Sequence, residues 1–141
     1  MRSSSLSLLI ALSAALSSSS IGCGRHVYGR EHLTEDLAKH HIDLRWGRLG
    51  NAAQRVTPEM RGPFIQIWAQ RLQSLELQDM DIVDVAQVDE DTAMVVVNVT
   101  YVDKLTMSVT TVQFPETWKR TDAGWLLSTV AELAATSGPA S

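Results

Sequence analysis

The sequence predicts an α+β domain in which helices come first and a curved antiparallel β-meander follows. Between residues 34 and 73, apolar residues recur mostly at steps of three and four, which is the spacing of amphipathic helices. From residue 76 onward, β-branched and aromatic residues alternate with polar ones in runs divided by short turns, as antiparallel strands do. Helices followed by consecutive strands typically pack on one face of the sheet that those strands form.

The composition fits one globular domain. The 141 residues are 45% hydrophobic and 20% charged, with a formal net charge of −4, which argues against a disordered chain and against a polytopic membrane protein. No basic run accompanies this acidic balance, so nucleic acid is not expected as a partner. The single cysteine cannot form a disulfide within the chain or a cysteine-based zinc site.

Residues 1–22 have the pattern of a secretory signal peptide. Arg2 gives a positive start, an apolar stretch from Leu6 to Leu16 follows, and the serines Ser17–Ser20 come next. The apolar stretch is 11 residues long, whereas a helix needs about 20 residues to cross the hydrocarbon layer of a membrane. It matches the central region of a signal peptide, so this segment is excluded from the predicted fold.

The lone cysteine follows this segment directly. Residues 20–23, Ser-Ile-Gly-Cys, resemble the bacterial lipobox, although lipoproteins usually have leucine in the place of Ser20. An unpaired thiol is unusual in an exported protein, and lipidation of Cys23 would account for it. The resemblance implies a membrane anchor of acyl chains such as palmitate. Because Gly24 is not aspartate, it also implies the outer membrane in a host that has one. Ordinary cleavage nearby, for example after Ser20, would instead leave Cys23 free.

Residues 23–33 are predicted to form a tether between the lipidated cysteine and the domain. Thr34 is the predicted first cap, because its hydroxyl can accept a hydrogen bond from the first turn of a helix. The apolar stripe between Leu37 and Val56 fits one helix, or two helices joined near Gly47–Gly50. A folded domain over residues 34–133 follows from these boundaries.

A further helix is predicted over residues 59–73, beginning later if Pro63 takes the first helical position. Pro115 cannot donate a hydrogen bond to a neighbouring strand, so it is expected at a sheet edge or a bulge. Residues 134–141 lack apolar anchors and are expected to form a flexible tail. Four strands are predicted, over residues 76–88, 92–102, 105–119 and 125–133.

The order of elements and the hairpin from Trp118 to Trp125 resemble the nuclear-transport-factor-2-like (SnoaL-like) superfamily of cone-shaped α+β domains. The helical segment LRWGRLGNAAQRVTPEMR also resembles a module of uncharacterised bacterial lipoproteins. The resemblance implies a curved sheet around a pocket. Fuller members have five or six strands, so four strands imply a shallower cone.

In that superfamily, enzymes place an aspartate, histidine or tyrosine inside the cone to move protons. The corresponding candidates here are His40, His41, Asp43, Tyr101 and Asp103, among which His41, Asp43 and Tyr101 are the preferred acid–base residues. His40 is adjacent to His41 and would point about 100° away from it on a helix. The sequence shows no catalytic serine motif, no phosphate-binding loop and no calcium loop, so neither a cofactor nor a metal is expected.

Aromatic residues are the candidates for a ligand pocket. Each tryptophan buries a large apolar surface, and packing between helices and sheet is the expected role of at least three of the four. The remaining possibility is that some of them line the mouth of an apolar pocket. The pocket candidates are Trp46, Trp68, Tyr101, Trp118 and Trp125.

The leading functional hypothesis is a membrane-anchored envelope lipoprotein whose domain binds without catalysing a reaction. Its expected partners are the membrane, through the lipid anchor, and an envelope protein or a small apolar ligand. The alternative is a pocket enzyme that performs isomerase- or cyclase-type acid–base chemistry on a small apolar substrate. Arginines on the helical half and acidic residues on the strand half further indicate a polarised domain that could face anionic headgroups or a partner.

Overall fold

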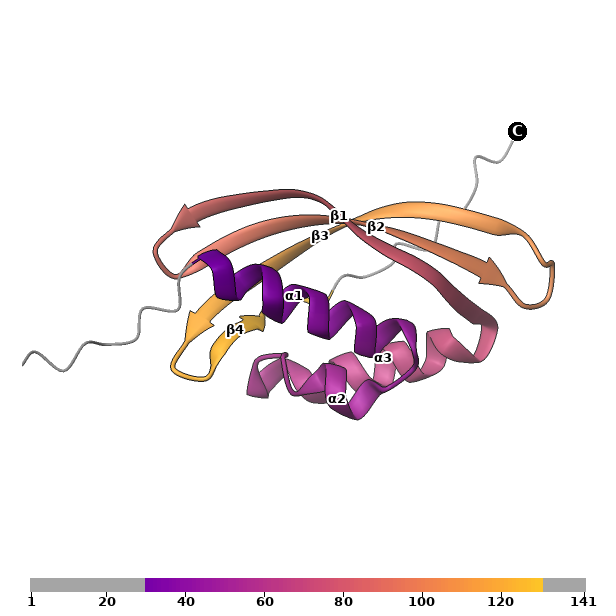
Figure 1. Cartoon of the computed structure of the whole chain (residues 1–141). Coiled ribbons are helices and arrows are strands. Elements are labelled where there is room, and N and C mark those ends of the chain that lie inside the picture. The colour runs from indigo at the N-terminus through magenta and orange to yellow at the C-terminus, as the bar shows by residue number, and fades with distance from the viewer. Residues whose placement is uncertain (1–29, 131–141) are drawn as a thin grey trace, which may run out of the picture.

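The computed structural model describes residues 30–130, in which three helices lie against one face of a four-stranded sheet (Figure 1). Cys23, the predicted signal peptide and the predicted tail lie outside these residues. The strands pair only with their sequence neighbours, in the order β1-β2-β3-β4, and every pair is antiparallel. No helix within this range is long and apolar enough to cross a membrane. The elements are α1 (Arg30–Arg45), α2 (Leu49–Ala53), the 3-10 turn η1 (Pro58–Met60), α3 (Arg61–Ser74), β1 (Leu75–Asp89), β2 (Thr92–Asp103), β3 (Val109–Thr121) and β4 (Gly124–Leu127).

The predicted helical stripe forms two helices, and Gly47 separates them. The Gly47 amide donates to the Leu44 carbonyl at 3.0 Å, and the Arg48 amide donates to the Asp43 carbonyl at 2.8 Å. This pair of bonds satisfies carbonyls at the end of α1, in a motif that requires the left-handed conformation. Gly47 supplies it with a φ of 68°. The chain then turns into α2, so the alternative of one continuous helix is wrong.

The first helix begins at Arg30, four residues before the predicted cap at Thr34. Thr34 is exposed inside the helix, whereas Leu33 is buried in the core together with Leu37. Residues four apart lie on one helix face, so burying Leu33 extends the helix backward. Residues 30–33 therefore belong to α1, which corrects the predicted end of the tether.

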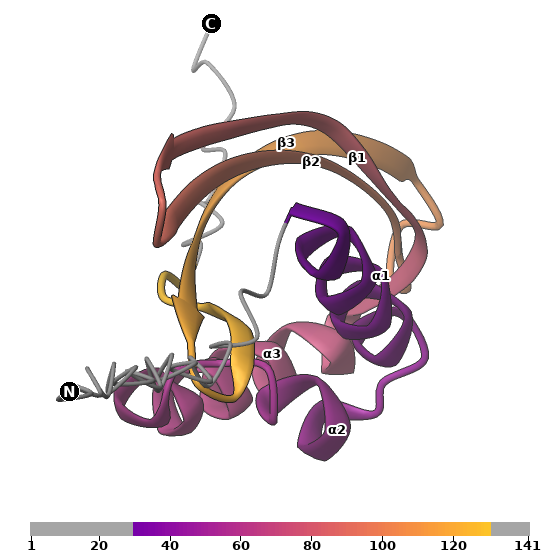
Figure 2. The ribbon, with the colours of Figure 1, turned by 60° about the vertical axis from the view of Figure 1, so that its left-hand side comes forward.

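The sheet curls over the helices, and β1 shows why. Its pairing with β2 shifts by one residue at three places, between Leu77 and Asp79, between Ile82 and Asp84, and between Gln87 and Asp89. Each extra residue bends a strand and increases its twist. In Figure 2 the sheet arches around α1, with α2 and α3 on the open side of the arch. The helix α1 therefore has the sheet on one side and the other helices on the other.

Alternate residues of β2 form one buried face. Ala93, Val95, Val97 and Val99 are each at most 1% exposed, and Tyr101 packs partly buried beside them. Pro115 lies in the part of β3 that β4 does not cover, because β4 pairs only with Trp118–Thr121. The expectation of an edge position for Pro115 is therefore met.

Two strand boundaries differ from the prediction. The third strand begins at Val109 rather than at residue 105, because residues 104–106 form a turn. Asp103 holds this turn, since its Oδ1 accepts hydrogen bonds from the amides of Leu105 and Thr106 at 2.8 and 3.0 Å. The last strand ends at Leu127, and residues 128–130 continue without strand structure.

Candidate functional site

Two adjacent histidines of α1 are buried in the middle of the domain. His40 is 0% exposed and His41 is 4% exposed. Adjacent helical residues point about 100° apart, and α1 has packing partners on both sides. His40 therefore faces α2 and α3, where it contacts Ala52 and Phe64, while His41 faces β3 and Glu116.

Glu116 is a buried carboxylate on the inward face of β3. His41 Nε2 lies 3.1 Å from each of its oxygens, and Trp118 Nε1 donates to Oε2 at 2.8 Å. Burial raises the pKa of Glu116, but the hydrogen bonds and charge of His41 outweigh that effect and hold its pKa below the usual 4.5. The carboxylate is therefore ionised at neutral pH, with both oxygens hydrogen-bonded.

His40 has the opposite character. Its Nδ1 lies 2.9 Å from the Ala52 carbonyl oxygen, and a carbonyl only accepts, so Nδ1 carries the proton and donates it. Burial lowers the pKa of His40 to about 4, which keeps the ring neutral at neutral pH. Nε2 then holds a lone pair, and no partner for it exists among the described residues. His40 is thus a neutral buried base with one unused nitrogen.

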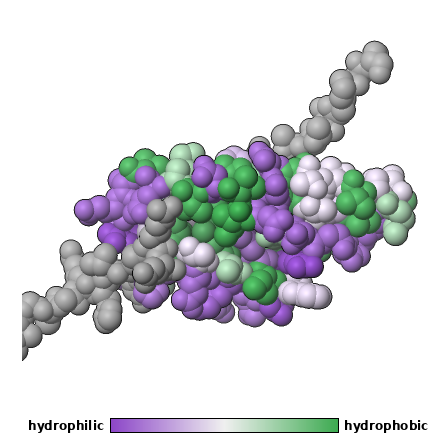
Figure 3. Space-filling view, turned by 45° about the horizontal axis from the view of Figure 1, so that its top comes forward, coloured by the Kyte–Doolittle hydropathy of each residue, from purple (hydrophilic) through white to green (hydrophobic). Residues whose placement is uncertain are grey.

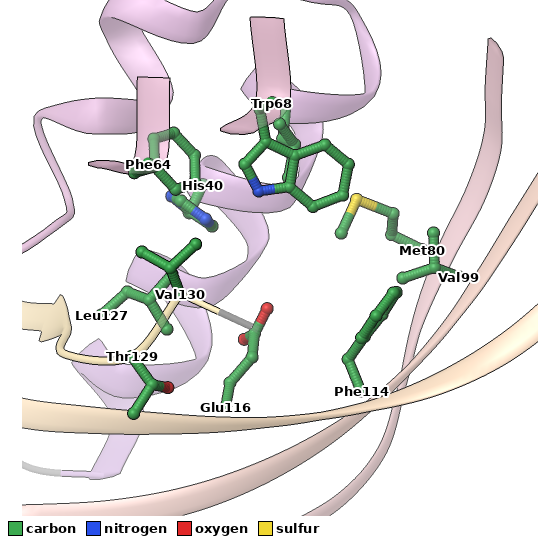
Figure 4. A pocket seen from close by; sticks show the side chains of 11 residues that line it. His40, Phe64, Trp68, Met80, Val99, Phe114, Glu116, Leu127, Thr129 and Val130 are labelled. Carbon is green, nitrogen blue, oxygen red and sulfur yellow. The ribbon is translucent and has the colours of Figure 1, made fainter. Parts of the chain in front are cut away.

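His40 and Glu116 line the same small hollow (Figure 4). Glu116 points up from β3 into its centre, Trp68 lies above, and Thr129 and Val130 lie to one side. The space open to the centre of a water-sized sphere is about 10 Å³, which is enough for about one water molecule. The hollow therefore combines a base, a carboxylate and apolar walls, but it has no room for a larger molecule in this conformation.

The architecture matches solved structures of cone-shaped domains. A ketosteroid isomerase-like protein from Erwinia carotovora atroseptica has a TM-score of 0.54 at 14% identity, over 70% of this chain and 89% of that chain. A candidate dehydratase of the nuclear-transport-factor-2-like family from Streptomyces avermitilis has a TM-score of 0.56 at 17% identity, over 69% of this chain and 88% of that chain. This chain has the nuclear-transport-factor-2-like fold. The predicted fold class is confirmed.

A candidate polyketide cyclase from Xanthomonas campestris has the same fold, with a TM-score of 0.54 at 10% identity over 72% of this chain and 92% of that chain. No protein-family model matches the sequence, and no curated protein is significantly similar to it. Structural similarity at identities this low shows the fold alone. The chemistry has to be argued from the residues of this chain.

The three preferred acid–base candidates, His41, Asp43 and Tyr101, do not meet in the cone. His41 is held by Glu116 and does not line the hollow. Asp43 lies at the other side of α1, where its carboxylate accepts hydrogen bonds from Arg48 at 2.8 Å and from Arg55 at 3.3 Å. Tyr101 is partly buried on β2 and does not line the hollow either.

The predicted pocket aromatics divide in the same way. Trp68 lines the hollow. Trp118 packs edge-to-face against His40, with ring centroids 5.4 Å apart. Trp125 is 1% exposed in the core, whereas Trp46 is 68% exposed at the end of α1. Three of the four tryptophans are thus buried, as expected.

Of the polar residues that line the hollow, His40 was among the sequence candidates, whereas Glu116 and Thr129 were missed. Glu116 falls between Phe114 and Trp118 in the alternation of β3, which places a carboxylate on an apolar face. The sequence did not indicate that His40 and Glu116 meet in one hollow, because they come from elements distant in sequence. Among residues 30–130 no group of three or more His, Cys, Asp or Glu side chains could hold a metal ion.

Proposed function

We propose that this chain is a membrane-anchored lipoprotein of the bacterial envelope whose cone domain binds through its surface and catalyses no reaction. The single observation that carries the proposal of a non-catalytic domain is the small size of the hollow. Ligand pockets usually have volumes of several hundred Å³, whereas this hollow has space for about one water molecule.

The polar groups in the cone support a structural role for its interior. The two oxygens of Glu116 are hydrogen-bonded to His41 and Trp118, so the carboxylate is held by its neighbours. Large aromatic and aliphatic side chains fill the space around it. A buried network with satisfied partners of this kind specifies one packing of the core.

The anchor rests on Cys23 and on the segment before it. A chain grown with an alkyne fatty acid and coupled to a fluorophore is expected to carry the label, and Cys23→Ala is expected to remove it. Ser3→Ala, in the region before the apolar stretch, serves as the matched control and should keep the label. Unlabelled wild-type protein, or label that survives Cys23→Ala, would contradict the anchor.

The closed hollow is tested with small molecules that are larger than water. Benzene and cyclohexanone at millimolar concentration are expected to leave the melting temperature unchanged, because a ligand stabilises only the state that it binds. A saturable rise in melting temperature that Val99→Phe abolishes by filling the hollow would show a cavity that opens to ligands. That result would contradict a purely surface role.

A second candidate, a pocket enzyme of the isomerase or cyclase type, is favoured by one observation. The unused Nε2 of His40 and the carboxylate of Glu116 face one apolar hollow, and Thr129 and Val130 of the segment after β4 form one of its walls. Movement of that segment would admit a substrate. His40 Nε2 would then take a proton from a carbon next to a carbonyl, the electron pair would become an enolate, and the proton would return at another carbon.

The chemistry of the second candidate is measurable without knowing the substrate. Exchange of the α-hydrogens of cyclohexanone in D₂O is expected to exceed the buffer rate if His40 is such a base. It should be lost in His40→Phe and kept in His32→Gln, a variant at an exposed histidine of the same helix. Equal exchange by the wild-type protein and His40→Phe would reject the enzyme.

A further inference from the structure

An apolar pair stands exposed at the C-terminal end of α1, where Ile42 lies in the helix and Trp46 directly follows its last residue, Arg45. Ile42 is 52% exposed and Trp46 is 68% exposed, and residues four apart lie one above the other on a helix. The Arg45 guanidinium lies 5.7 Å from the centre of the Trp46 ring. Arg45 also reaches Asp79, but at 3.9 Å and with nearly half of each side chain exposed, so this ion pair is weak. Ile42, Arg45 and Trp46 are called the α1 face below.

Charge is divided between the helices and the sheet. Residues 30–74 contain seven Lys or Arg and five Asp or Glu, for a net charge of +2, whereas residues 75–130 contain three and ten, for a net charge of −7. The sheet side seen in Figure 3 shows hydrophobic patches bordered by hydrophilic residues. A negatively charged surface therefore attracts the helical layer and repels the sheet.

The chain length places α1 near the proposed anchor. Six residues separate Cys23 from Arg30, the first residue of α1. Even fully extended, this stretch and its end bonds span only about 25 Å, at about 3.5 Å per residue. If Cys23 carries the lipid, as proposed above, α1 is the first element that can meet the membrane surface.

We propose that the α1 face rests on an anionic lipid surface and orients the domain with its sheet directed away from the membrane. Tryptophan prefers the interface between headgroups and acyl chains, isoleucine adds apolar contact, and arginine pairs with phosphate groups. Juxtamembrane cations are attracted to anionic lipid. The inference rests on the proposed anchor for its geometry, but the contact itself is a property of the α1 face.

The contact is tested on a chain that carries no lipid. All core residues lie between Leu33 and Leu127, so residues 23–141 with Cys23→Ala retain the whole core. This chain is mixed with vesicles of phosphatidylethanolamine and phosphatidylglycerol, and separately with vesicles of phosphatidylcholine alone. We expect co-sedimentation with the anionic vesicles and a blue shift in tryptophan emission, because Trp46 is the exposed tryptophan among the four.

Variants distinguish binding through the α1 face from non-specific binding through other exposed apolar residues. The double variant Ile42→Gln/Trp46→Gln is expected to lower the affinity for anionic vesicles about tenfold or more, since two exposed apolar anchors are removed. Arg45→Glu should remove the preference for anionic lipid. Val88→Gln/Met94→Gln, at the β1–β2 hairpin, removes residues that are 60% and 49% exposed and should bind as the parent does. Equal melting temperatures confirm that the variants fold.

Three results would overturn the proposal. They are equal binding by the α1-face variant and the hairpin control, no binding of the parent to anionic vesicles, or cross-linking of the α1 face to an envelope protein in place of lipid. Because the tested chain lacks the acyl anchor, these results bear on the α1 face alone. Fatty-acid labelling at Cys23 bears on the anchor alone, so the two failures are distinguishable.

Discussion

At the scale of single residues, the carboxylate of Glu116 is buried and hydrogen-bonded at both of its oxygens. It is 7% exposed and accepts hydrogen bonds from the rings of His41 and Trp118. Two buried donors depend on it, so its loss would leave both without partners. The cost of an unsatisfied buried donor exceeds the net gain of an ordinary hydrogen bond.

Glu116→Leu is therefore expected to destabilise the domain by about 3 to 5 kcal/mol, as removing one partner of a buried pair does. Denaturant unfolding measured by tryptophan fluorescence checks this value. Glu35→Gln is the comparison variant, because both side chains of the Glu35–Lys39 pair are about half-exposed and such pairs contribute about 1 kcal/mol or less. Similar losses in both variants would contradict a special role for Glu116.

His40 makes the stability depend on pH. Its pKa is about 4 in the folded domain against an ordinary value of 6.5. Between these values the unfolded chain binds a proton that the folded chain does not, so the free energy of unfolding rises with pH across this window. The rise is on the order of 3 kcal/mol by the usual conversion of pKa shifts. It is complete above pH 6.5.

In His40→Phe, the free energy of unfolding is expected to change less with pH across this window. Glu116 contributes in a different range, because its lowered pKa gives stability that is present above its ordinary value of 4.5 and lost at lower pH. The acid loss below that value should therefore persist in His40→Phe. A slope between pH 4 and 6.5 that the substitution leaves unchanged would assign the titration to another group.

At the scale of elements, one contact ties the first helix to the last strand. Asp36 Oδ2 on α1 accepts a hydrogen bond from the Trp125 amide of β4 at 3.0 Å. Gly124, beside it, has a φ of 110°, and a Cβ at this position would lie 3.0 Å from the same oxygen. The turn before β4 and the packing of α1 against it therefore require a residue without a side chain at position 124.

Gly124→Ala is expected to cost about 2 kcal/mol, because it combines a strained φ with displacement of Asp36. Gly50→Ala is the matched control, since a Cβ there meets no atom within 4 Å, and its expected effect is a gain of about 0.5 kcal/mol. Thermal unfolding of both variants provides the comparison. An equal response at the two glycines would be evidence against the close approach of α1 to β4.

At the scale of the whole molecule, the sheet has one strand that is covered along its full length. Within residues 30–130, β2 pairs with β1 on one side and with β3 on the other. The strand β1 has an open edge, and β4 covers only the last residues of β3. Carboxylates along β1, such as Asp81 and Asp84, discourage pairing at its open edge.

Amide hydrogen exchange is expected to be slowest in β2 and faster at the outward-directed amides of β1 and of Val109–Phe114, because their edges are open to water. Exchange read by NMR or mass spectrometry checks the order. Uniform protection along β1, equal to that of β2, would mean that another chain covers this edge.

The order and faces of most elements could be predicted because they depend on local pattern. The alternation of Ala93, Val95, Val97 and Val99 determines which side of β2 is buried, and Gly47 marks the break between α1 and α2. These signals lie within a few residues of the structure that they specify. The start of α1 could not be predicted in this way, because Leu33 is buried by residues distant in the chain.

The sequence by itself determined the α+β order, the four strands and the position of Cys23 directly after the predicted signal peptide. Only the tertiary structure decided which polar residues meet. Curvature from the extra residues in β1 wraps the sheet around α1, and this brings His41 against Glu116 across 75 positions of sequence. Local spacing carries no information about such a distance, because it is set by packing, and the same packing leaves Trp46 outside the core.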